Sequence, residues 1–436
     1  PTLEIPSPSN KLPHGMKRTV YFFNRFYRPD PCATAQILGS LCDRLERAAF
    51  QVKVVCGSAG YLEARVRRPQ TEVVDGVPVI RLRSTAFGRQ SPIGRLLDYA
   101  SLHVSMAVFL LRQVKTADVV VVTTDPPLIG VTVALARLFK PFKVVSWCQD
   151  VFPEIAMAAV TAADHWEGRR PVGRLALGAV CRGLSGLRGW RDWSLRQAEA
   201  VVAISDPMAA ALRHRGVGDA RVRVIENWAV QSEAEASTVA TLRRHWGLTG
   251  NLVLGHFGNL GRGHDFRTVL RAIEAWVDVP GVEWVFVGGG HGGEILRSRF
   301  EGSEAPVRFF PYLPLEILGS GLQVPDLHWL SLRPAMEAHL FPSKFYGILK
   351  AGKPVLLIGG LDSALGRLIQ TEEIGFVVEE GDSDRLHALL RAVAADPGTL
   401  ARMAERSRAL YERAYSGERQ QDQWATLLTK VTTGSG

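Results

Sequence analysis

Short apolar runs alternate with amphipathic segments along most of this chain. The first unit has an apolar run at Arg18–Phe23, a segment with helical periodicity at Ala33–Ala48 and a second apolar run at Val52–Cys56. A strand, a helix and a strand at this spacing form a βαβ unit, which requires a parallel sheet. Within Val73–Arg83, two runs are joined by Asp75-Gly76, and this short link predicts a hairpin.

The same alternation recurs in two halves, separated by a polar and alanine-rich stretch near residues 228–245. The pattern predicts two α/β halves, with parallel sheets, that face a cleft. We expect a loose leader at 1–16, a first domain at 17–235, a second domain at 236–415, and a C-terminal helix at 416–436 that crosses back to the first domain. In the second half, strands are expected at Leu252–Phe257, Glu283–Gly288, Val307–Phe310, His328–Leu330, Val355–Ile358 and Gly375–Val378.

Polar, proline-marked loops follow two predicted strands of the first half. Thr124–Pro127 follows the run Val119–Thr123, and Gln149–Glu154 follows the run Lys143–Trp147. Ligands of open α/β sheets bind beyond the carboxyl ends of the strands, so both loops are expected at the cleft. Asp150 is either a general base or orienting carboxylate, or a capping aspartate at a strand end.

The longest apolar segment is Leu96–Leu111. It is shorter than the roughly 18 residues of a membrane-spanning helix, and Asp98 and His103 interrupt it. We therefore predict a buried helix here.

A glycine-rich turn opens the second half. The strand within Asn251–Leu260 runs into Gly258-Asn259, and Gly261 and Arg262 follow. This order lets the backbone approach a phosphate closely, with an arginine available for bidentate contact. The spacing is that of neither a dinucleotide fingerprint nor a P-loop.

A second candidate anion site lies in Leu340–Ile358. Ser343 and Lys344 stand where a helix is expected to start, and Gly352 and Pro354 end that helix before an apolar strand. Free backbone N–H groups and the lysine would favour an anion there. The alternative is an ordinary capped helix with a solvated lysine.

Composition narrows the choice of partner. The 436 residues carry a formal net charge of +9, which suits an anionic small substrate, an anionic membrane surface or nucleic acid. No nucleic-acid-binding motif accompanies the charge, so we expect no nucleic-acid partner. The 5 cysteines include no CxxC pair, which favours a reduced, cytoplasmic-type chain without a zinc site.

Arginines and tryptophans are interleaved in Trp166–Arg196. One interpretation is a basic amphipathic surface that rests on anionic lipid. The other is a solvated helix face combined with core tryptophans. The residues concerned are Arg169, Arg170, Arg174, Arg182, Arg188 and Arg191 with Trp166, Trp190 and Trp193.

Several motifs taken together resemble glycosyltransferase family four, and in particular its bacterial capsule, colanic-acid and O-antigen type transferases. The resemblance spans roughly residues 18–415. In the first half it rests on the proline-marked loops described above and on Pro29-Asp30. In the second half it rests on Gly258-Asn259-Leu260-Gly261-x-x-His264-Asp265, Val287-Gly288-x-Gly290, Asp326-Leu327-His328-x-x-Ser331-Leu332, Pro342-Ser343-Lys344-x-Tyr346-Gly347 and Gly352-x-Pro354.

The resemblance implies an α/β GT-B fold, in which two Rossmann-like, doubly wound parallel-sheet domains face a cleft. It also implies a retaining transfer of sugar from a UDP- or GDP-linked donor, held mainly by the second domain. It implies that Glu337 lies near the donor sugar or ribose, and that Asp150 faces the reacting centre from the acceptor side. Tyr346 and Phe309–Tyr312 would flank the base. The diphosphate would be held by Gly258, Asn259, Gly261, Arg262, Ser343 and Lys344.

The resemblance also implies chemistry without a metal or other cofactor, because Arg262 and Lys344 would stabilise the leaving diphosphate. With Asp150 and Glu337, these are the candidate catalytic residues. We expect a saccharide acceptor linked to polyprenyl diphosphate, and a cytoplasmic enzyme in peripheral contact with the inner face of the cell membrane.

Two departures from the family pattern leave alternatives open. The family's paired glutamates, spaced E-x7-E, would fall at His339 and Gly347. The glycine-rich first loop is replaced by the segment Pro29–Ala33. A nucleotide-sugar 2-epimerase of the same fold and a catalytically silent sugar-nucleotide-binding module are therefore the alternatives.

Overall fold

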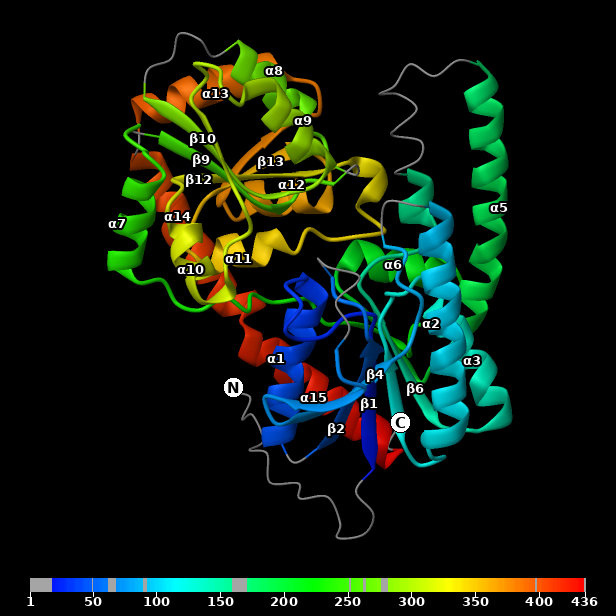
Figure 1. Ribbon diagram of the computed structural model, residues 1–436. Coiled ribbons are helices and arrows are strands. Elements are labelled where there is room, and N and C mark those ends of the chain that lie inside the picture. Colours follow the sequence, from blue (N-terminus) through cyan, green and yellow to red (C-terminus); the bar gives the residue numbers. More distant parts are fainter. Residues whose placement is uncertain are drawn as a thin grey trace.

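A computed structural model describes residues 18–48, 50–61, 68–88, 92–158, 171–250, 252–261, 264–275, 281–396 and 398–434. Within these ranges, side chains are described for all residues except 92 and 171–181. The chain forms two α/β domains that lie one above the other in Figure 1, each with its own sheet and its own packed helices. The predicted architecture of two doubly wound, mainly parallel sheets is confirmed.

The first sheet has the strand order β3-β4-β2-β1-β5-β6-β7-β8. Its ladders are parallel except for the β3–β4 pair, which is the predicted hairpin. Asp75 and Gly76 turn this hairpin with φ of 51° and 90°. The strands are β1 (Thr19–Phe23), β2 (Gln51–Gly57), β3 (Thr71–Val74), β4 (Val77–Leu82), β5 (Val119–Val122), β6 (Lys143–Cys148), β7 (Ala200–Ala203) and β8 (Val222–Val224).

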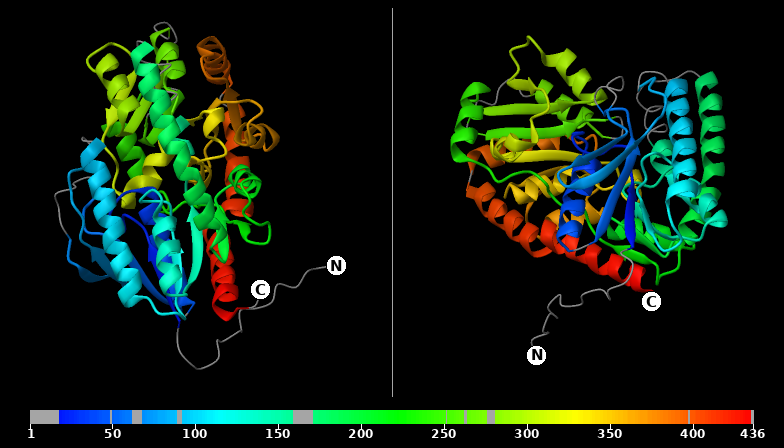
Figure 2. Two further views of the ribbon diagram at one scale, coloured as in Figure 1. Left: turned by 90° about the vertical axis from the view of Figure 1, so that its right-hand side faces the viewer. Right: turned by 60° about the horizontal axis from the view of Figure 1, so that its bottom comes forward.

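The helices of this domain cover both faces of the sheet. Figures 1 and 2 show α2, α3 and α5 side by side on one side of the domain, while α1 and α15 lie together on another. The bounds are α1 (Ala33–Arg47), α2 (Pro92–Gln113), α3 (Ile129–Phe139), α5 (Pro171–Arg196), α6 (Asp206–His214) and α15 (Gly417–Thr433).

The second sheet has six parallel strands in the order β11-β10-β9-β12-β13-β14. The strands are β9 (Leu252–Asn259), β10 (Val282–Gly289), β11 (Val307–Phe310), β12 (Leu327–Leu332), β13 (Val355–Gly359) and β14 (Gly375–Val378). The helices are α7 (Ala236–His245), α8 (Arg267–Glu274), α9 (His291–Phe300), α10 (Leu315–Gln323), α11 (Lys344–Lys350), α12 (Ala364–Thr371), α13 (Ser383–Ala395) and α14 (Gly398–Leu410), with short helical turns at Pro334–Met336 and Tyr411–Tyr415.

After the second domain, the chain returns to the first through α15. The side chain of Trp424 is fully buried, and its ring centroid lies 4.6 Å from that of Trp147 on β6. The side-chain amide of Gln421 donates to the hydroxyl of Ser40 on α1 at 2.7 Å. The core of the first domain therefore contains side chains from both ends of the described chain.

The two domains meet through the loop that follows β6. Asp150 and Leu340 form an isolated antiparallel bridge, and the backbone N–H of Val151 donates to the carbonyl of His339 at 2.8 Å. Backbone hydrogen bonds of this kind hold the carboxyl edge of the first sheet against the second domain.

Helix α2 does not have the predicted buried position. It buries one face, with Leu102, Met106 and Leu110, but its opposite face is apolar and exposed. Among the described residues it is the one helix that is long and apolar enough to span a membrane. The most apolar 18-residue stretch within Ile93–Gln113 has a mean hydropathy of 1.2, and 33% of this stretch is buried. The expectation of a buried helix was wrong because both faces of α2 are apolar and the sheet covers only one.

We expect Trp424→Ala to lower the free energy of unfolding by about 3–5 kcal/mol, because truncating a buried tryptophan leaves a cavity. Urea unfolding followed by circular dichroism measures this loss. Trp190→Ala is the matched control, since Trp190 is 55% exposed and its removal should change stability by less than about 0.5 kcal/mol. Equal losses for both variants would contradict a structural role for α15.

Candidate functional site

Glycine turns end two neighbouring strands of the second sheet. Gly258 at the end of β9 has φ of 106°, and Gly288 near the end of β10 has φ of 127°. A Cβ atom at Gly288 would lie 2.4 Å from the carbonyl oxygen of Gly258, so these backbones approach more closely than other residues would allow. The approach leaves backbone exposed at the carboxyl edge of the sheet, where ligands of this fold class bind.

Lys344, the first residue of α11, lies across this glycine turn. Its Nζ donates to the carbonyl of Asn259 at 2.9 Å, and a Cβ atom at Gly258 would lie 3.0 Å from its Cε. Gly261 follows on the same turn, and the side chain of Ser343 makes no capping hydrogen bond to α11. The structure therefore brings the predicted glycine turn together with Lys344 and Ser343.

The surroundings of Lys344 set its charge. Burial of the ammonium lowers the pKa of Lys344 to about 8, so it is mainly protonated at pH 7. His264 lies nearby, with its Nδ1 3.0 Å from the carbonyl of Ser331. Burial, and then the charge of Lys344, lower the pKa of His264 to about 3, so this imidazole is neutral. Lys344 is thus a cation that gains from meeting an anion.

A cavity of about 210 Å³ adjoins the glycine turns. Phe286 and Phe309 stack on one another on its wall, with ring centroids 5.2 Å apart, and the guanidinium of Arg297 lies 5.1 Å from the ring centroid of Phe309. The other lining residues are His256, Gly258, Leu260, Val287, Gly288, Gly289, Gly290, Gly293 and Glu294. Phe309 therefore lies where a planar base could stack, whereas sequence reasoning missed Phe286 and Arg297.

Tyr346 does not lie at this cavity. Its side chain is fully buried between the domains, 5.4 Å from Phe341 and 5.5 Å from Tyr415 between ring centroids. Tyr346 does not line the cavity beside the glycine turns, and its predicted contact with the base remains a prediction. The helix turns this residue toward the core, two positions beyond Lys344.

Glu337 takes a structural position. Its carboxylate accepts hydrogen bonds from the backbone N–H groups of Ala364 and Leu365, the latter at 3.3 Å, at the start of α12. A carboxylate there satisfies free N–H groups and the positive end of the helix. Its predicted role at the donor sugar or ribose remains a prediction. Arg262 lies outside the described residues.

Asp150 lies on the opposite domain, in the loop after β6. Its Oδ1 is buried without a hydrogen-bond partner among the described residues. Burial raises the pKa of Asp150 to about 6, although a hydrogen bond with Thr124 opposes the shift. The backbone N–H of Asp150 donates to the Thr124 hydroxyl at 3.2 Å, so the two predicted cleft loops of this domain meet.

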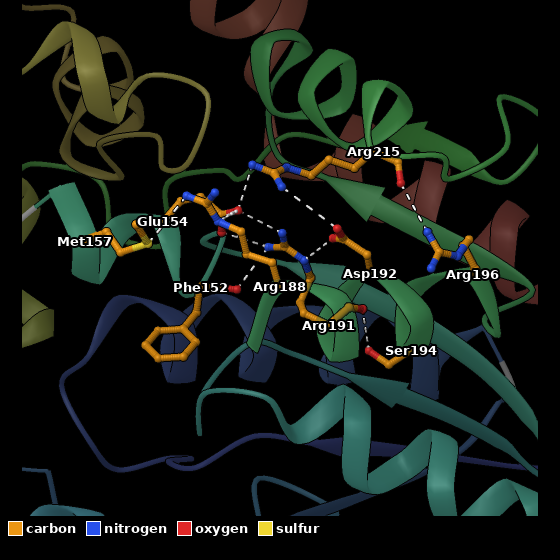
Figure 3. A network of polar contacts seen from close by, with 9 residues as sticks. All are labelled: Phe152, Glu154, Met157, Arg188, Arg191, Asp192, Ser194, Arg196 and Arg215. Carbon is orange, nitrogen blue, oxygen red and sulfur yellow. Dashed lines mark hydrogen bonds and ion pairs between the residues drawn. The ribbon is translucent and has the colours of Figure 1, made fainter. Parts of the chain in front are cut away.

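A charged network anchors the Asp150 loop (Figure 3). The buried carboxylate of Glu154 accepts hydrogen bonds of 3.1 and 3.0 Å from Arg191, and forms ion pairs with Arg215 at 2.7 Å and Arg188 at 3.2 Å. Arg191 also donates to the carbonyl of Phe152 at 3.0 Å. Burial alone would raise the pKa of Glu154, but the hydrogen bonds and charges of the arginines hold it below its ordinary value.

This network corrects part of the interpretation of the arginine-rich segment. Arg188 and Arg191 were candidates for a lipid-facing surface, but their guanidinium groups turn inward to Glu154. Arg182 is exposed, as is Trp190. Residues 159–170, with Arg169 and Arg170, lie outside the described residues, as does the side chain of Arg174.

The carboxyl edge of the second sheet thus combines a cation, closely approaching glycine turns and an aromatic cavity, which suits an anionic ligand with a planar group. The buried carboxylate of Asp150 lies on the first domain, in the loop that the Glu154 network anchors. The described residues contain no group of three or more His, Cys, Asp or Glu side chains that could hold a metal ion.

Comparison with known proteins agrees with this arrangement. Residues 33–228 match the family described as "Glycosyl transferase 4-like domain". The chain is 28% identical over 291 residues to the "Probable glycosyltransferase WbjE" of Pseudomonas aeruginosa. The matched region covers 65% of this chain and 68% of that protein.

Solved structures share the fold over nearly the whole chain. Sucrose-phosphate synthase from Thermosynechococcus elongatus has a TM-score of 0.69 at 16% identity and covers 96% of this chain and 100% of its own. Anabaena HepE in complex with UDP-glucose has a TM-score of 0.64 at 17% identity, and covers 94% of this chain and 99% of its own. The predicted GT-B fold is confirmed. Residues 33–228 thus match a glycosyl transferase 4-like domain, and the chain is similar in sequence to a probable glycosyltransferase and in fold to enzymes of the GT-B class.

Proposed function

We propose that this protein is a retaining glycosyltransferase that moves a sugar from a UDP- or GDP-linked donor to a lipid-linked saccharide in the synthesis of a bacterial surface polysaccharide. The observation that carries this proposal is the contact of Lys344 with the glycine turn at Gly258-Asn259, beside an aromatic cavity. In a nucleotide sugar the diphosphate joins a base to a sugar. The lysine and the glycine turn suit the diphosphate, and the aromatic cavity suits the base.

The leaving group explains why a cation is needed here. Sugar transfer releases a nucleoside diphosphate on which negative charge develops, and a fixed cation in a partly desolvated site stabilises that charge. Lys344 supplies the cation, and the hydroxyl of Ser343, which does not cap α11, and backbone N–H groups of the glycine turn supply hydrogen bonds. In this proposal the diphosphate is neutralised by these groups without a metal ion or other cofactor, and Arg262 adds a second cation.

The cavity beside the turn is the proposed place of the base. Its stacked phenylalanines, Phe286 and Phe309, offer a face to a planar ring, and Arg297 adds hydrogen-bond donors. HepE, which shares the fold, was solved with UDP-glucose. We therefore propose UDP as the first nucleotide to test.

The acceptor is proposed to approach from the first domain. Asp150 has a buried oxygen without a hydrogen-bond partner in the described part of the chain, and its pKa is about 6. It is therefore mainly ionised at pH 7 and can accept a hydrogen bond from an acceptor hydroxyl. The Glu154 network holds its loop in place. Retention of configuration then follows if the hydroxyl attacks the face from which the diphosphate leaves.

Nucleotide binding should depend on Lys344. We expect UDP to raise the melting temperature of the wild type, with a gain of about 2.7 kcal/mol at 100 times the dissociation constant. Lys344→Ala should abolish most of this shift, because one such charge contact contributes a few kcal/mol. Thermal unfolding with UDP, GDP and ADP measures it and identifies the base.

Lys350→Ala is the matched control, since it removes a lysine from the same helix. The Nζ of Lys350 donates to the carbonyl of Gln231 at 2.6 Å, away from the glycine turn. This variant should melt earlier but keep the nucleotide shift. No shift with any nucleotide would contradict the donor site. Binding with neither transfer nor donor hydrolysis would favour the silent module, and conversion of the donor alone would favour the epimerase.

The turnover rate should depend on the ionisation of Asp150. Because burial raises its pKa to about 6, the carboxyl group is neutral below that pH and ionised above it. We expect the rate of transfer to rise as the pH increases through about 6 and then to level off. Asp150→Asn should lower the rate about 10²- to 10⁴-fold and remove this inflection.

Asp125→Asn, in the neighbouring loop, is the control for a general loss of negative charge at the cleft. It should keep an inflection, at a lower pH than in the wild type, because the charge of Asp125 contributes to the raised pKa of Asp150. An Asp150→Asn enzyme with wild-type rate and pH profile would show that this residue only shapes the loop.

A further inference from the structure

Exposed apolar side chains gather on two helices of the first domain. The described residues include 14 large hydrophobic side chains that are exposed, and nine of them lie on α2 and α3. Single exposed apolar residues are normal, but a contiguous patch marks a contact surface. We name this patch the apolar face; it comprises Ile93, Leu96, Leu97, Val104, Val108 and Leu111 on α2, and Leu135, Leu138 and Phe139 on α3.

The apolar face is continuous across both helices. Val104, Val108 and Leu111 follow one another at helical spacing and are 65%, 43% and 43% exposed. Helix α3 runs beside α2 in the same direction, since the ring of His103 lies 2.7 Å from the Thr132 hydroxyl and Lys140 Nζ donates to the carbonyl of Leu111 at 3.2 Å. Phe139, 81% exposed, therefore lies at the same end as Leu111.

No described element covers this side of the domain. The left view of Figure 2 looks onto it, and α2, α3 and α5 face the viewer with nothing drawn in front of them. The opposite face of α2 is packed against the sheet, so α2 is held parallel to the surface of its own domain. A helix held in this way can lie on a bilayer but cannot cross it.

The exposed charged residues of the segment that forms the apolar face have one sign. Between residues 92 and 143, Arg95, Arg112 and Lys115 are exposed. The acidic residues of this segment do not offset them at the surface. Asp98 and Asp118 are buried and accept backbone hydrogen bonds, and Asp125 lies in the cleft loop.

We propose that the apolar face docks this protein on the surface of an anionic lipid bilayer. Apolar side chains on one face of a helix, bordered by Lys and Arg without exposed carboxylates, bind in the plane of the interface with anionic lipid. A second copy of the chain is the weaker candidate, because two such faces would bring like charges together. The inference stands on this surface and does not require the proposed transfer activity.

The apolar face also leads to the candidate acceptor loop. Helix α3 begins at Ile129, directly after the loop that contains Thr124, and the Thr124 hydroxyl accepts a hydrogen bond from the backbone of Asp150. Docking through α2 and α3 would therefore hold the Asp150 loop near the lipid surface. A saccharide carried on a lipid could reach it without leaving the bilayer.

Co-sedimentation with vesicles tests the proposal without nucleotide. Wild type should bind vesicles that contain phosphatidylglycerol at low salt, and should bind phosphatidylcholine vesicles more weakly. Val104→Asp/Val108→Asp should lower the bound fraction about tenfold or more, because it places charges within the apolar face. Val73→Asp is the matched control: Val73 is 69% exposed on β3, outside this face, and its replacement should leave binding unchanged.

A second variant tests the charges. Arg112→Glu/Lys115→Glu should weaken binding to phosphatidylglycerol vesicles and reduce its dependence on salt. A retained UDP-induced melting shift, or a far-UV spectrum like that of wild type, shows that the variants are folded. The proposal is overturned if wild type does not bind, or if Val73→Asp weakens binding as much as Val104→Asp/Val108→Asp. A third result would also overturn it: the wild type does not bind lipid, sedimentation velocity shows that it is a dimer, and Val104→Asp/Val108→Asp converts this dimer to a monomer.

Discussion

The buried carboxylate of Glu154 is the constraint on which the arrangement of the two domains depends. Its side chain is 3% exposed, so it must be paired within the protein, and its partners come from α5 and from the end of α6. Breaking a buried pair of this kind costs about 3–5 kcal/mol because an uncompensated charge remains. The pairing holds the loop that presents Asp150 and Val151 to the second domain. The backbone contact of this loop with the second domain therefore depends on charges within the first domain.

His339 shows how this contact relates to the altered glutamate pair. In the family pattern a glutamate would stand at this position. Here the residue is a histidine, and its backbone carbonyl accepts a hydrogen bond from the backbone N–H of Val151. Burial lowers the pKa of His339, and the nearby charge of Glu154 opposes that shift. The residue thus belongs to the domain contact, and the proposed donor site consists of the glycine turn and Lys344 instead.

Features set by short stretches of sequence were predictable. The strands, the Asp75-Gly76 hairpin and the meeting of Lys344 with Asn259 follow from local patterns, because the carboxyl ends of neighbouring parallel strands share one edge. Features that depend on which face of a helix is covered could not be predicted. Helix α2 is apolar all round, so its pattern does not reveal that one face is exposed, and Tyr346 follows Lys344 but turns inward. The pairing of Glu154 with Arg191 and Arg215 joins residues 37 or more positions apart, which no local pattern reveals.

The position of α15 has a consequence for synthesis of the protein. The first domain is assembled from residues on both sides of the second, so in topological terms the second domain is an insertion within the first. On a ribosome that adds about 5–20 residues per second, the segment between β8 and α15 takes roughly 10 to 40 s to emerge. During that interval Trp147 lacks the tryptophan that covers it in the finished protein. The second domain, whose sheet is continuous in sequence, can complete its core first, and the domain that is made first is the last to be finished.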